Sequence, residues 1–382
     1  MKKEVLIVGA GPSGLATAAC LNMFSIPNII LEKEDCSASL WRKRAYDRLK
    51  LHLAKQFCEL PHMPYPSTFP TFIPKDQFIQ YLDNYQARFK PNIVYCTVVD
   101  SANYDKYKGT WSIMACDKVT GEVKEYTAKF LVVATGENDE GMIPDIPGLK
   151  TFSGEVVHSS FYKSGAAYTG KNVLVVGSGN SGMEIAYDLS NFGAKTAITI
   201  QSPFHVMTKE LIYMGMVLVK YLNVRLVDTL LLMLSNLKYG DLSKYGITRP
   251  KLGPLSLKIA TGRSSVIDVG TVAKIKSGEI QVVKGLSSIQ GNEVLFTDDK
   301  SYQFDAIVFA TGYQSKVKSW LKDDFGLLGQ DGFPVAKFPN HWKGENGLYF
   351  AGFARSGLAG ISMDAENIAD DIKMAHDCCE SA

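Results

Sequence analysis

The sequence predicts an α/β fold class in which two Rossmann-like domains combine, the second inserted into the first. Three observations predict it. Two glycine-rich motifs, "GAGPSG" and "GSGNSG", each follow a short apolar run and precede a helical pattern. The motifs start 168 residues apart, which is too far for a solenoid repeat and suits a second domain. Near the C-terminus, apolar runs like those of the first domain return, so we expect that domain to resume there.

Length and composition agree with two hydrophobic cores. The chain has 382 residues, 46% of them hydrophobic, and a net charge of +2. This near-neutral balance, without a basic block, gives no reason to expect a nucleic-acid partner. We expect residues 1–165 to form the first part of one domain, residues 166–303 the inserted domain, and residues 304–382 the rest of the first domain.

Cysteine usage and the longest apolar region indicate a cytoplasmic protein without a membrane span. The seven cysteines are odd in number and contain no C-x-x-C pair, and Cys378 and Cys379 are adjacent rather than spaced as a redox pair. The apolar region 211–237 is interrupted by three charged residues, which would be costly at a bilayer centre. We therefore expect amphipathic helices there that cover a pocket.

The N-terminal residues contain a complete βαβ unit around the first motif. Gly9 allows the tight turn, Gly11 lets the backbone approach a pyrophosphate, and Gly14 permits close packing of helix on strand. The start of the helix offers free N–H groups to phosphates. Glu32, at the end of the second strand, is suited to accept hydrogen bonds from a ribose diol. Further residues that we expect to bind a cofactor are Pro12, Ser13, Lys33, Trp41, Arg42, Thr135, Gly136 and Gly352.

The second motif repeats this logic in the inserted domain. At the end of its second strand stands Gln201, where an acidic residue would favour an unphosphorylated ribose and a basic one a 2′-phosphate. His205 and Lys209 follow closely, either to meet a phosphate or as a solvated surface pair. The candidate residues of this second site are Gly177, Ser178, Gly179, Asn180, Ser181, Gly182, Gln201 and His205.

Two nucleotide sites in one chain indicate a flavin at one site and a nicotinamide that delivers hydride at the other. Disulfide reductases pass the electrons to a cysteine pair, which this chain lacks, so oxygen becomes the expected acceptor. No pattern of residues indicates a metal site. We also expect no side-chain nucleophile, because the cofactors carry the chemistry.

The joint between the domains has a motif of its own. "FSGEVVHSSFYK" matches F-x-G-x-x-x-H-x-x-x-[FY]-[KR] through Phe152, Gly154, His158, Tyr162 and Lys163, and resembles the identifying motif of class B flavin-dependent monooxygenases. Gly154 suits a turn, while His158 and the aromatic residues are expected to pin the linker. We therefore expect His158 to have a positional role beside NADP rather than to move a proton.

The resemblance extends across nearly the whole chain. "RAYDRLKLHLAKQFCELP", "VIDVG", "FATGY" and "HWKGENGLYFAGF" are similar to segments of the plant YUCCA flavin monooxygenases, the indole-3-pyruvate monooxygenases of auxin biosynthesis. The resemblance implies FAD at the first motif and NADPH at the second. It also implies oxidative decarboxylation of indole-3-pyruvate to indole-3-acetate through a peroxide at flavin C4a, with O₂ and the small-molecule substrate as partners. Members of the family usually carry Arg where Gln201 stands, so the preference for NADPH is not fixed by this residue.

Several further segments receive expected roles. The two "ATG" turns, which include Thr135–Gly136 and Thr311–Gly312, are expected to act as hinges and to contact the adenosine moieties. The loop Gly357–Gly360, before a helix that begins near Ser362, either aims a helix N-terminus at the flavin or is a plain glycine-rich loop. Region 211–237 is expected to supply part of an apolar wall for an indole ring. One or two of four basic residues should meet a phosphate or a carboxylate, namely among Arg42, Arg44, Arg48 and Lys50.

Two alternative functions share these motifs. A flavin monooxygenase that oxygenates the nitrogen or sulfur of soft nucleophiles would need the same nucleotide sites. A sensor that binds FAD and NAD(P)H without oxygenating anything is also compatible with Gln201. The sequence does not predict an oligomeric state.

Overall fold

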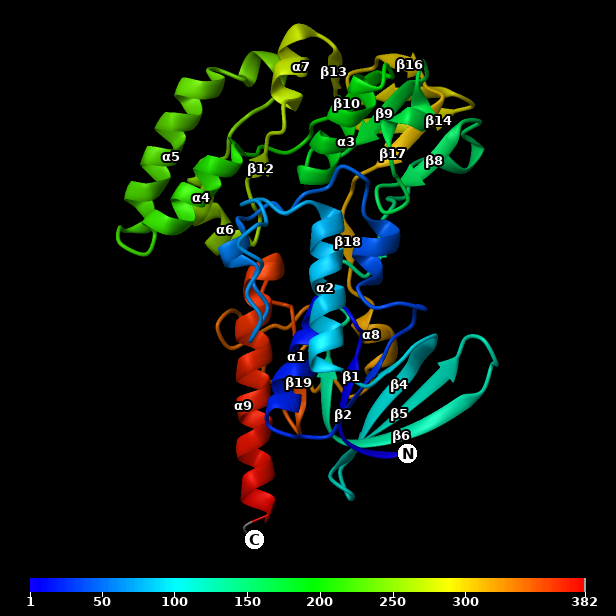
Figure 1. Cartoon of the computed structure of the whole chain (residues 1–382). Helices are drawn as coiled ribbons and strands as arrows, with labels where there is room; N and C mark the ends of the chain where they lie inside the picture. Colours follow the sequence, from blue (N-terminus) through cyan, green and yellow to red (C-terminus); the bar gives the residue numbers. More distant parts are fainter. Residues whose placement is uncertain (381–382) are drawn as a thin grey trace. The chain divides into compact units, whose positions relative to one another are not determined.

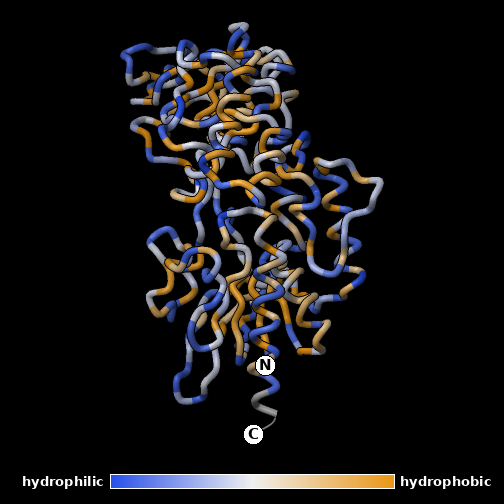
Figure 2. Tube along the Cα trace, turned by 90° about the vertical axis from the view of Figure 1, so that its left-hand side faces the viewer, coloured by the Kyte–Doolittle hydropathy of each residue, from blue (hydrophilic) through white to orange (hydrophobic). Residues whose placement is uncertain are grey.

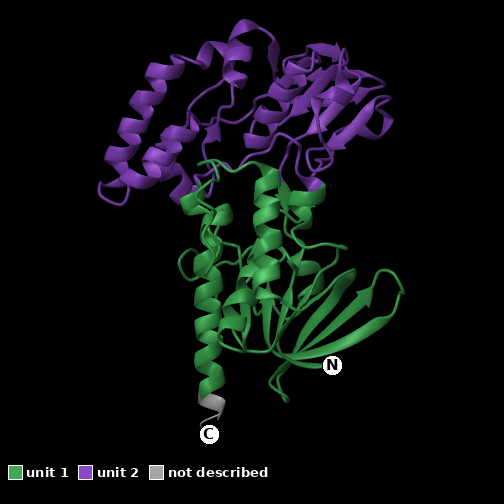
Figure 3. Cartoon of the chain, viewed as in Figure 1, with its two compact units in different colours: residues 1–43, 55–140, 313–382 green, residues 44–54, 141–312 purple. Residues whose placement is uncertain are grey.

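The two glycine motifs lie in two different units of the chain. The structure, a computed structural model, describes the backbone of residues 1–380 and the side chains of residues 1–377. Unit 1 contains Met1–Lys43, Lys55–Glu140 and Tyr313–Ala382, and unit 2 contains Arg44–Ala54 and Gly141–Gly312 (Figure 3). Each unit is built around a sheet with helices against it, which confirms the predicted α/β fold class.

Unit 1 contains a seven-stranded mixed sheet in the order β3-β2-β1-β6-β5-β4, with β19 also paired to β6 (Figure 1). The pairs among β1, β2, β3, β6 and β19 are parallel, whereas β4, β5 and β6 form an antiparallel meander. The apolar runs "VLIV" and "NIIL" are buried, as expected for parallel strands covered on both faces. The strands are β1 (Lys2–Val8), β2 (Asn28–Leu31), β3 (Ile93–Val94), β4 (Thr97–Asp105), β5 (Thr110–Asp117), β6 (Val123–Val133) and β19 (Leu348–Phe350).

The helices of unit 1 pack closely because the first of them is rich in small residues. Helix α1 buries Ala16, Ala18 and Ala19, and α9 packs along it. Helix α2 occurs where the sequence has Phe78, Tyr81 and Tyr85 on one face, and these side chains are buried. The helical elements are α1 (Pro12–Met23), η1 (Leu40–Arg44, which runs one residue past the unit), η2 (Lys55–Phe57), α2 (Lys75–Phe89), α8 (Val317–Trp320), η6 (Gly357–Gly360) and α9 (Ile361–Glu380).

Unit 2 contains a five-stranded, fully parallel sheet in the order β13-β10-β9-β17-β8. This sheet includes two strands, β8 and β17, that lie outside the 166–303 segment expected from the sequence. The place of β17 could not be predicted, because its run "AIVF" and the run "FLVV" of β6 are equally apolar and both precede an "ATG" turn. Neither pattern indicates which of the two sheets the strand joins. The strands are β8 (Glu155–His158), β9 (Asn172–Val176), β10 (Lys195–Thr199), β13 (Ile280–Val283) and β17 (Ala306–Phe309).

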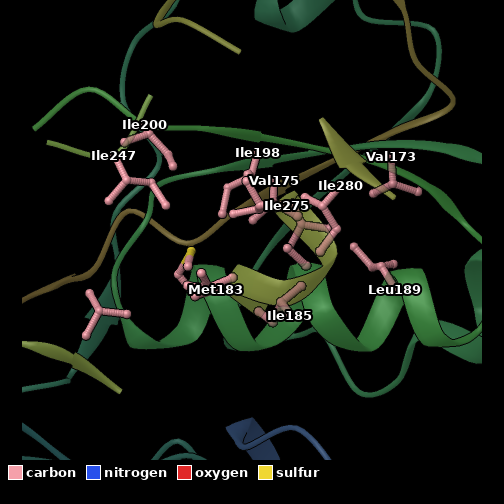
Figure 4. Packing of buried hydrophobic residues seen from close by; sticks show 14 of the residues in the cluster. Val173, Val175, Met183, Ile185, Leu189, Ile198, Ile200, Ile247, Ile275 and Ile280 are labelled. Atoms are coloured by element: carbon pink, nitrogen blue, oxygen red, sulfur yellow. The ribbon is translucent and has the colours of Figure 1, made fainter. Parts of the chain in front are cut away.

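The two faces of this sheet are covered differently. Helices α3 (Asn180–Asn191) and α7 (Thr271–Ser277) cover one face, where Met183, Ile185 and Leu189 point from α3 toward the strands (Figure 4). The other face packs against a small antiparallel sheet, with Phe296 and Phe304 in its core. The strands of that small sheet are β14 (Leu286–Gln290), β15 (Glu293–Phe296) and β16 (Ser301–Gln303).

A group of helices is inserted in unit 2 between β11 and β12. Asp228 on α5 holds this group together, because its carboxylate accepts hydrogen bonds from the backbone N–H groups of Leu255 and Ser256 at 2.7 and 3.0 Å. Among residues 1–380, no helix is both long and apolar enough to cross a membrane. The elements are β11 (Val206–Met207), α4 (Lys209–Leu218), α5 (Val224–Tyr239), η5 (Ser243–Tyr245), α6 (Pro254–Thr261) and β12 (Val266–Ile267).

Within each unit the buried hydrophobic residues lie mainly on strands and helices. Hydrophobic and hydrophilic stretches alternate along the chain (Figure 2). Short elements connect the larger ones. They are β7 (Glu140–Gly141), η3 (Leu149–Thr151), η4 (Gly165–Tyr168) and β18 (Tyr313–Gln314).

Candidate functional site

The first glycine loop has a backbone that only glycine permits. Gly9 has φ +106°, a conformation that L side chains rarely adopt. A Cβ on Gly14 would lie 1.9 Å from the carbonyl oxygen of Gly9, so the helix packs directly on the turn. Gly11 is the N-cap of α1 with ordinary extended angles, and a Cβ there would meet no protein atom within 4 Å. The loop is therefore tight on the protein side and open where a phosphate would approach.

The residues around this loop order its first turn. Pro12 begins α1, and Ser13 is buried next to Gly352, where a Cβ would come within 2.1 Å of the Ser13 hydroxyl oxygen. The Gly352 N–H donates to Asp364 Oδ2 on α9 at 2.8 Å. Asp364 also lies 3.0 Å from Nε2 of the buried His341. The sequence analysis missed this His341–Asp364 pair, which fixes Gly352 against the glycine loop.

Glu32 lies beside the loop rather than in solvent. Its side chain is 5% exposed, and its Oε2 accepts from the Ala10 N–H at 2.6 Å. Its Oε1 accepts from the Glu34 N–H at 2.9 Å. Burial raises the pKa of this carboxyl, while the two backbone donors act in the opposite direction. Each oxygen keeps a second lone pair, so the carboxylate can still accept from a ribose hydroxyl.

The end of β6 supplies the other wall of the first site. The Thr135 hydroxyl oxygen is buried and has no hydrogen-bond partner within the described part of the chain. Gly136 follows with φ +82°. An unpartnered buried hydroxyl costs free energy that a ligand hydroxyl or phosphate would recover. Together with the open side of Gly11, it means that the residues present fit a dinucleotide such as FAD.

Three other candidates of this site are held by protein partners. Lys33 forms an ion pair with Asp139. Trp41 packs edge-on against Phe78, with ring centroids 4.6 Å apart. Arg42 pairs with Asp83 and its Nε donates to the Ser37 carbonyl at 2.9 Å. These contacts give each of the three a structural role in unit 1, and contact with a cofactor remains a prediction for them. 

The second glycine loop has the same backbone as the first. Gly177 has φ +109°, a Cβ on Gly182 would lie 1.9 Å from the Gly177 carbonyl oxygen, and a Cβ on Gly179 would meet nothing within 4 Å. Asn180 begins α3, and its side-chain oxygen accepts from the Ile267 N–H at 2.7 Å. Ser178 and Ser181 occupy the remaining loop positions and are half-buried. This loop also fits a pyrophosphate.

The end of β10 differs from the end of β2. Val8 pairs with Leu31 in unit 1, and Val176 pairs with Thr199 in unit 2, so the counterpart of Glu32 is Ile200. Thr199 Oγ1 accepts from the Gly177 N–H at 3.0 Å, whereas in the first loop the backbone N–H of Ala10 is bound by a carboxylate. No acid therefore stands at this position to repel a 2′-phosphate.

Gln201 and His205 are not brought together. Gln201 is exposed and packs on Gly285, where a Cβ would come within 2.4 Å of its Nε2. His205 is 1% exposed, and its Nε2 lies 2.7 Å from the Leu252 carbonyl oxygen. Burial lowers the pKa of His205, so the ring is neutral near pH 7. The prediction that His205 lies on the solvated surface is therefore wrong, because the backbone between Gln201 and His205 turns the His205 side chain into the core.

His158 fastens the turn Thr311–Gly312 that follows β17. Its Nδ1 accepts from the Ser160 N–H at 3.2 Å, so the proton is on Nε2, which donates to the Gly312 carbonyl at 3.0 Å. The ring is 4% exposed and lies over Gly141, where a Cβ would come within 2.2 Å of Nδ1. Burial lowers the pKa of His158, which keeps it neutral. The adjacent Thr311 hydroxyl donates to the Met142 carbonyl.

The other residues of the motif "FSGEVVHSSFYK" contact several segments of unit 2. Gly154 is required because a Cβ would lie 2.4 Å from the Asp305 carbonyl oxygen. The Tyr162 hydroxyl donates to Asp188 at 2.7 Å, and Lys163 Nζ donates to the Ala45 carbonyl at 3.3 Å. Phe152 packs against the cluster on the far face of the sheet. The motif therefore lies within unit 2 rather than between the units, and its Lys163 holds segment 44–54.

Arg48, one of the four basic candidates, pairs with two buried acids of α3 that the sequence analysis missed. Its Nε lies 3.3 Å from Glu184, its NH1 lies 3.7 Å from Asp188, and its guanidinium stacks on Tyr187 at 4.6 Å. Burial alone would raise the pKa of Glu184, but hydrogen bonds from His52 and Tyr46 and the charge of Arg48 hold it below its usual value. These partners neutralise Arg48 inside unit 2. Among the other basic candidates, Lys50 is exposed.

Three remaining predictions concern unit 1 and the helical insertion. Gly357–Gly360 is the short helix η6, and the Ser362 hydroxyl at the start of α9 donates to the Glu59 carbonyl. Region 211–237 is broken into α4 and α5, whose shared core centres on Val227 and Leu231. The side chains of Cys378 and Cys379 lie outside the described residues.

Comparison with known proteins identifies the family and the fold of the chain. The chain matches the family model described as "Flavin-binding monooxygenase-like" over residues 2–324. "Probable indole-3-pyruvate monooxygenase YUCCA10" of Arabidopsis thaliana is 57% identical over 374 residues, which is 98% of each chain. "Indole-3-pyruvate monooxygenase YUCCA6" of the same plant is 47% identical over 382 residues, 98% of this chain and 90% of the relative. A flavin-containing monooxygenase from Stenotrophomonas maltophilia has the same fold, with a TM-score of 0.73 at 18% identity over 98% of this chain and 99% of that one.

Proposed function

Because the chain belongs to the flavin-binding monooxygenase-like family, we propose that it converts indole-3-pyruvate to indole-3-acetate, the auxin-forming reaction. The balance is one indole-3-pyruvate, one O₂, one NADPH and one proton in, and one indole-3-acetate, one CO₂, one water and one NADP⁺ out. FAD and NADPH, when bound, supply hydride transfer and the activation of oxygen. The observation that carries the proposal is 57% identity over 98% of the chain to a relative named for this reaction.

We assign FAD to unit 1. The Gly11 backbone and the N-terminus of α1 would hold the pyrophosphate, because the loop is open on that side. Glu32 would accept from the ribose, and the Thr135 hydroxyl would gain the partner that it lacks. Gly352, held by Asp364, keeps the wall next to Ser13 free of a side chain. These residues bind and orient the flavin without taking part in proton transfer.

We assign NADPH to unit 2. Gly179 and the N-terminus of α3 would hold its pyrophosphate in the same way. His158 acts as a positioning residue: its Nε2–H remains on the Gly312 carbonyl, and its lowered pKa keeps the ring neutral. The imidazole thus fixes the turn that ends β17 and moves no proton.

Two further features belong to the proposal. The apolar residues of α4 and α5 would provide the dry, aromatic-compatible wall that an indole ring needs and would help to exclude water from the reacting oxygen. A cytoplasmic location is supported by the free thiols of Cys20, Cys36, Cys58, Cys96 and Cys116.

The proposal is tested by the product. Purified protein loaded with FAD is given indole-3-pyruvate, NADPH and O₂, and indole-3-acetate is detected by mass spectrometry beside a reaction without protein. Formation of indole-3-acetate and CO₂ in step with NADPH consumption is expected. NADPH consumption that yields only hydrogen peroxide, or oxygenation of an amine or thioether in preference to the 2-oxo acid, would contradict the proposed substrate. No oxygen uptake at all would favour a nucleotide sensor.

A further inference from the structure

A cavity of about 530 Å³ lies at the free edge of the parallel sheet in unit 2, outside the residues that the motifs identify. Its floor is apolar and is formed by Ile200, Ile280 and Val282. Its rim carries lysines from three separate segments, which are Lys244, Lys284 and Lys300. An apolar floor with a cationic rim is suited to a ligand that is both partly apolar and anionic.

The strand register connects this cavity to the second glycine loop. Thr199 of β10 pairs with Val283 of β13, and the Ile200 N–H donates to the Val283 carbonyl at 3.3 Å. Gln201 then packs on Gly285, the second residue after β13. The carboxyl ends of β9, β10 and β13 therefore lie at the same end of the sheet. In open α/β sheets nucleotides bind at this carboxyl end of the strands. Two strand spacings, roughly 10 Å, separate β9 from β13, a span that an adenosine moiety covers.

The cavity also lies on the face of the sheet that helix α3 covers. Ile280 and Val282 pack in the cluster on the α3 side, whereas Val283 packs on the opposite side. Because strand side chains alternate, position 284 returns to the α3 side, in agreement with the presence of Lys284 in the cavity lining. The α3 N-terminus, Ile200 and Lys284 thus lie at the carboxyl end of the strands and on the α3 side of the sheet.

The three rim lysines are not equivalent. Lys300 pairs with Asp298, whose oxygen lies 3.6 Å from its Nζ, so part of its charge is neutralised. Lys244 lies over the Tyr245 ring at 5.3 Å. Lys284 is exposed, and no hydrogen bond or ion pair to it occurs in the part of the chain that the structure describes. Lys284 is therefore the cation best placed to accept an anionic ligand.

We propose that Lys284 is the specificity-determining residue that binds the 2′-phosphate of NADPH, with Lys244 as a second cation, in the cavity beside Ile200. The inference rests on the proposed NADPH site in unit 2 and deepens it. Lys284 supplies the positive charge that the neutral Gln201 lacks. Ile200 stands in the second site where the first has Glu32, and this apolar side chain does not repel a phosphate. A lysine meets a phosphate as a strong, charge-assisted donor.

The experiment measures dinucleotide binding directly. Dissociation constants of NADP⁺ and NAD⁺ are determined by calorimetry on the FAD-loaded protein and on its Lys284→Ala, Lys284→Arg and Lys195→Ala variants. Lys195→Ala is the matched control, because Lys195 is an exposed lysine at the opposite, amino end of β10. Loss of one charge-assisted contact should weaken NADP⁺ binding about tenfold to a hundredfold in Lys284→Ala and leave NAD⁺ binding unchanged. Lys284→Arg should keep NADP⁺ binding within about threefold of the original.

Four outcomes would overturn the inference. Unchanged NADP⁺ binding in Lys284→Ala would show that this lysine does not contact the phosphate. Equal weakening of NADP⁺ and NAD⁺ would show a structural effect, and an equal loss in Lys195→Ala would show a general effect of net charge. Failure of the unaltered protein to bind NADP⁺ would contradict the proposed nucleotide site itself, which is a different result. Inorganic phosphate that binds with the same dependence on Lys284, while NADP⁺ does not, would assign the cavity to a free anion and also overturn it.

Discussion

The two glycine loops are nearly the same in backbone and different in what surrounds them. Gly9 and Gly177 have φ +106° and +109°, and in both loops the third glycine lies directly on the first. After the neighbouring strand, however, unit 1 has the buried acid Glu32, and unit 2 has the apolar Ile200. The backbone of both loops thus fits a pyrophosphate, and we propose that this one position separates binding of a ribose diol from binding of a phosphorylated ribose.

The largest effect is expected where the two loops are most alike. Gly14→Ala places a methyl group 1.9 Å from the Gly9 carbonyl oxygen, so the turn and the helix must move apart. Such overpacking against the backbone should lower the free energy of unfolding by about 3 kcal/mol or more. Chemical denaturation of the apoprotein measures it, with Gly11→Ala as the control, because Gly11 has ordinary extended angles and a Cβ there meets no protein atom within 4 Å. A Gly14→Ala variant as stable as that control would contradict the geometry of the loop.

The next effect separates ligand binding from folding. Gly11→Val adds its side chain on the open side of the first loop, and the φ and ψ of Gly11 are ordinary for any residue. We expect a folded but colourless protein, because the valine occupies the space of the pyrophosphate. Absorbance spectra and circular dichroism measure the two properties. Retained flavin in the folded variant would disprove the assignment of FAD to unit 1.

A smaller effect is expected at the position where the loops differ. Both carboxylate oxygens of Glu32 accept from backbone N–H groups, those of Ala10 and Glu34. In Glu32→Gln the side-chain NH₂ group replaces one of these oxygens, so a donor would face one of the two N–H groups. The dissociation constant of FAD should rise about tenfold to a hundredfold. Thr199→Val in unit 2 should leave FAD binding unchanged, because it removes only the acceptor for the Gly177 N–H. Fluorescence titration of the apoprotein with FAD tests both, and equal losses would remove the distinction between the loops.

The smallest effect concerns pH. Burial lowers the pKa of His158 below its unfolded value, so at acidic pH the unfolded chain binds more protons than the folded chain. Stability should therefore fall as the pH drops below the unfolded value of about 6.5. His158→Gln should show a shallower fall, since one titrating group is lost, although His205 contributes in the same direction. Denaturation midpoints between pH 7.5 and pH 5.5 measure it, and an unchanged slope would contradict a buried neutral His158.

Local patterns in the sequence were sufficient for the glycine loops and for helix Lys75–Phe89. Those features depend on residues that are close together in the chain. The glycines of a loop occur at fixed spacing, and the apolar residues of the helix recur on one face. The placement of strand β17 was not predictable, because its apolar run fits a parallel sheet in either unit. The predicted family resemblance and the α/β fold class are both confirmed.

Contacts between distant residues account for the rest of what the sequence analysis missed. Arg48 meets Glu184, 136 positions away, and no periodicity links the two. His205 follows the strand closely and the sequence predicts either a phosphate contact or a solvated position for it, yet the chain turns it into the core. Lys284 belongs to no motif, and only the pairing of β13 with β10 places it at the same end of the sheet as the proposed nucleotide site.

The most direct test of the division of roles between the loops is the rate of flavin reduction by NADPH without oxygen, followed by rapid mixing. Gly179→Val fills the open side of the second loop and leaves the first untouched. We predict that this variant is as yellow as the original protein and that its reduction rate at limiting NADPH falls about a hundredfold or more, since the loss of dinucleotide binding by steric exclusion exceeds that of a single charged hydrogen bond. A reduction rate equal to that of the original protein would show that the nicotinamide cofactor binds elsewhere and would contradict the assignment of the second loop.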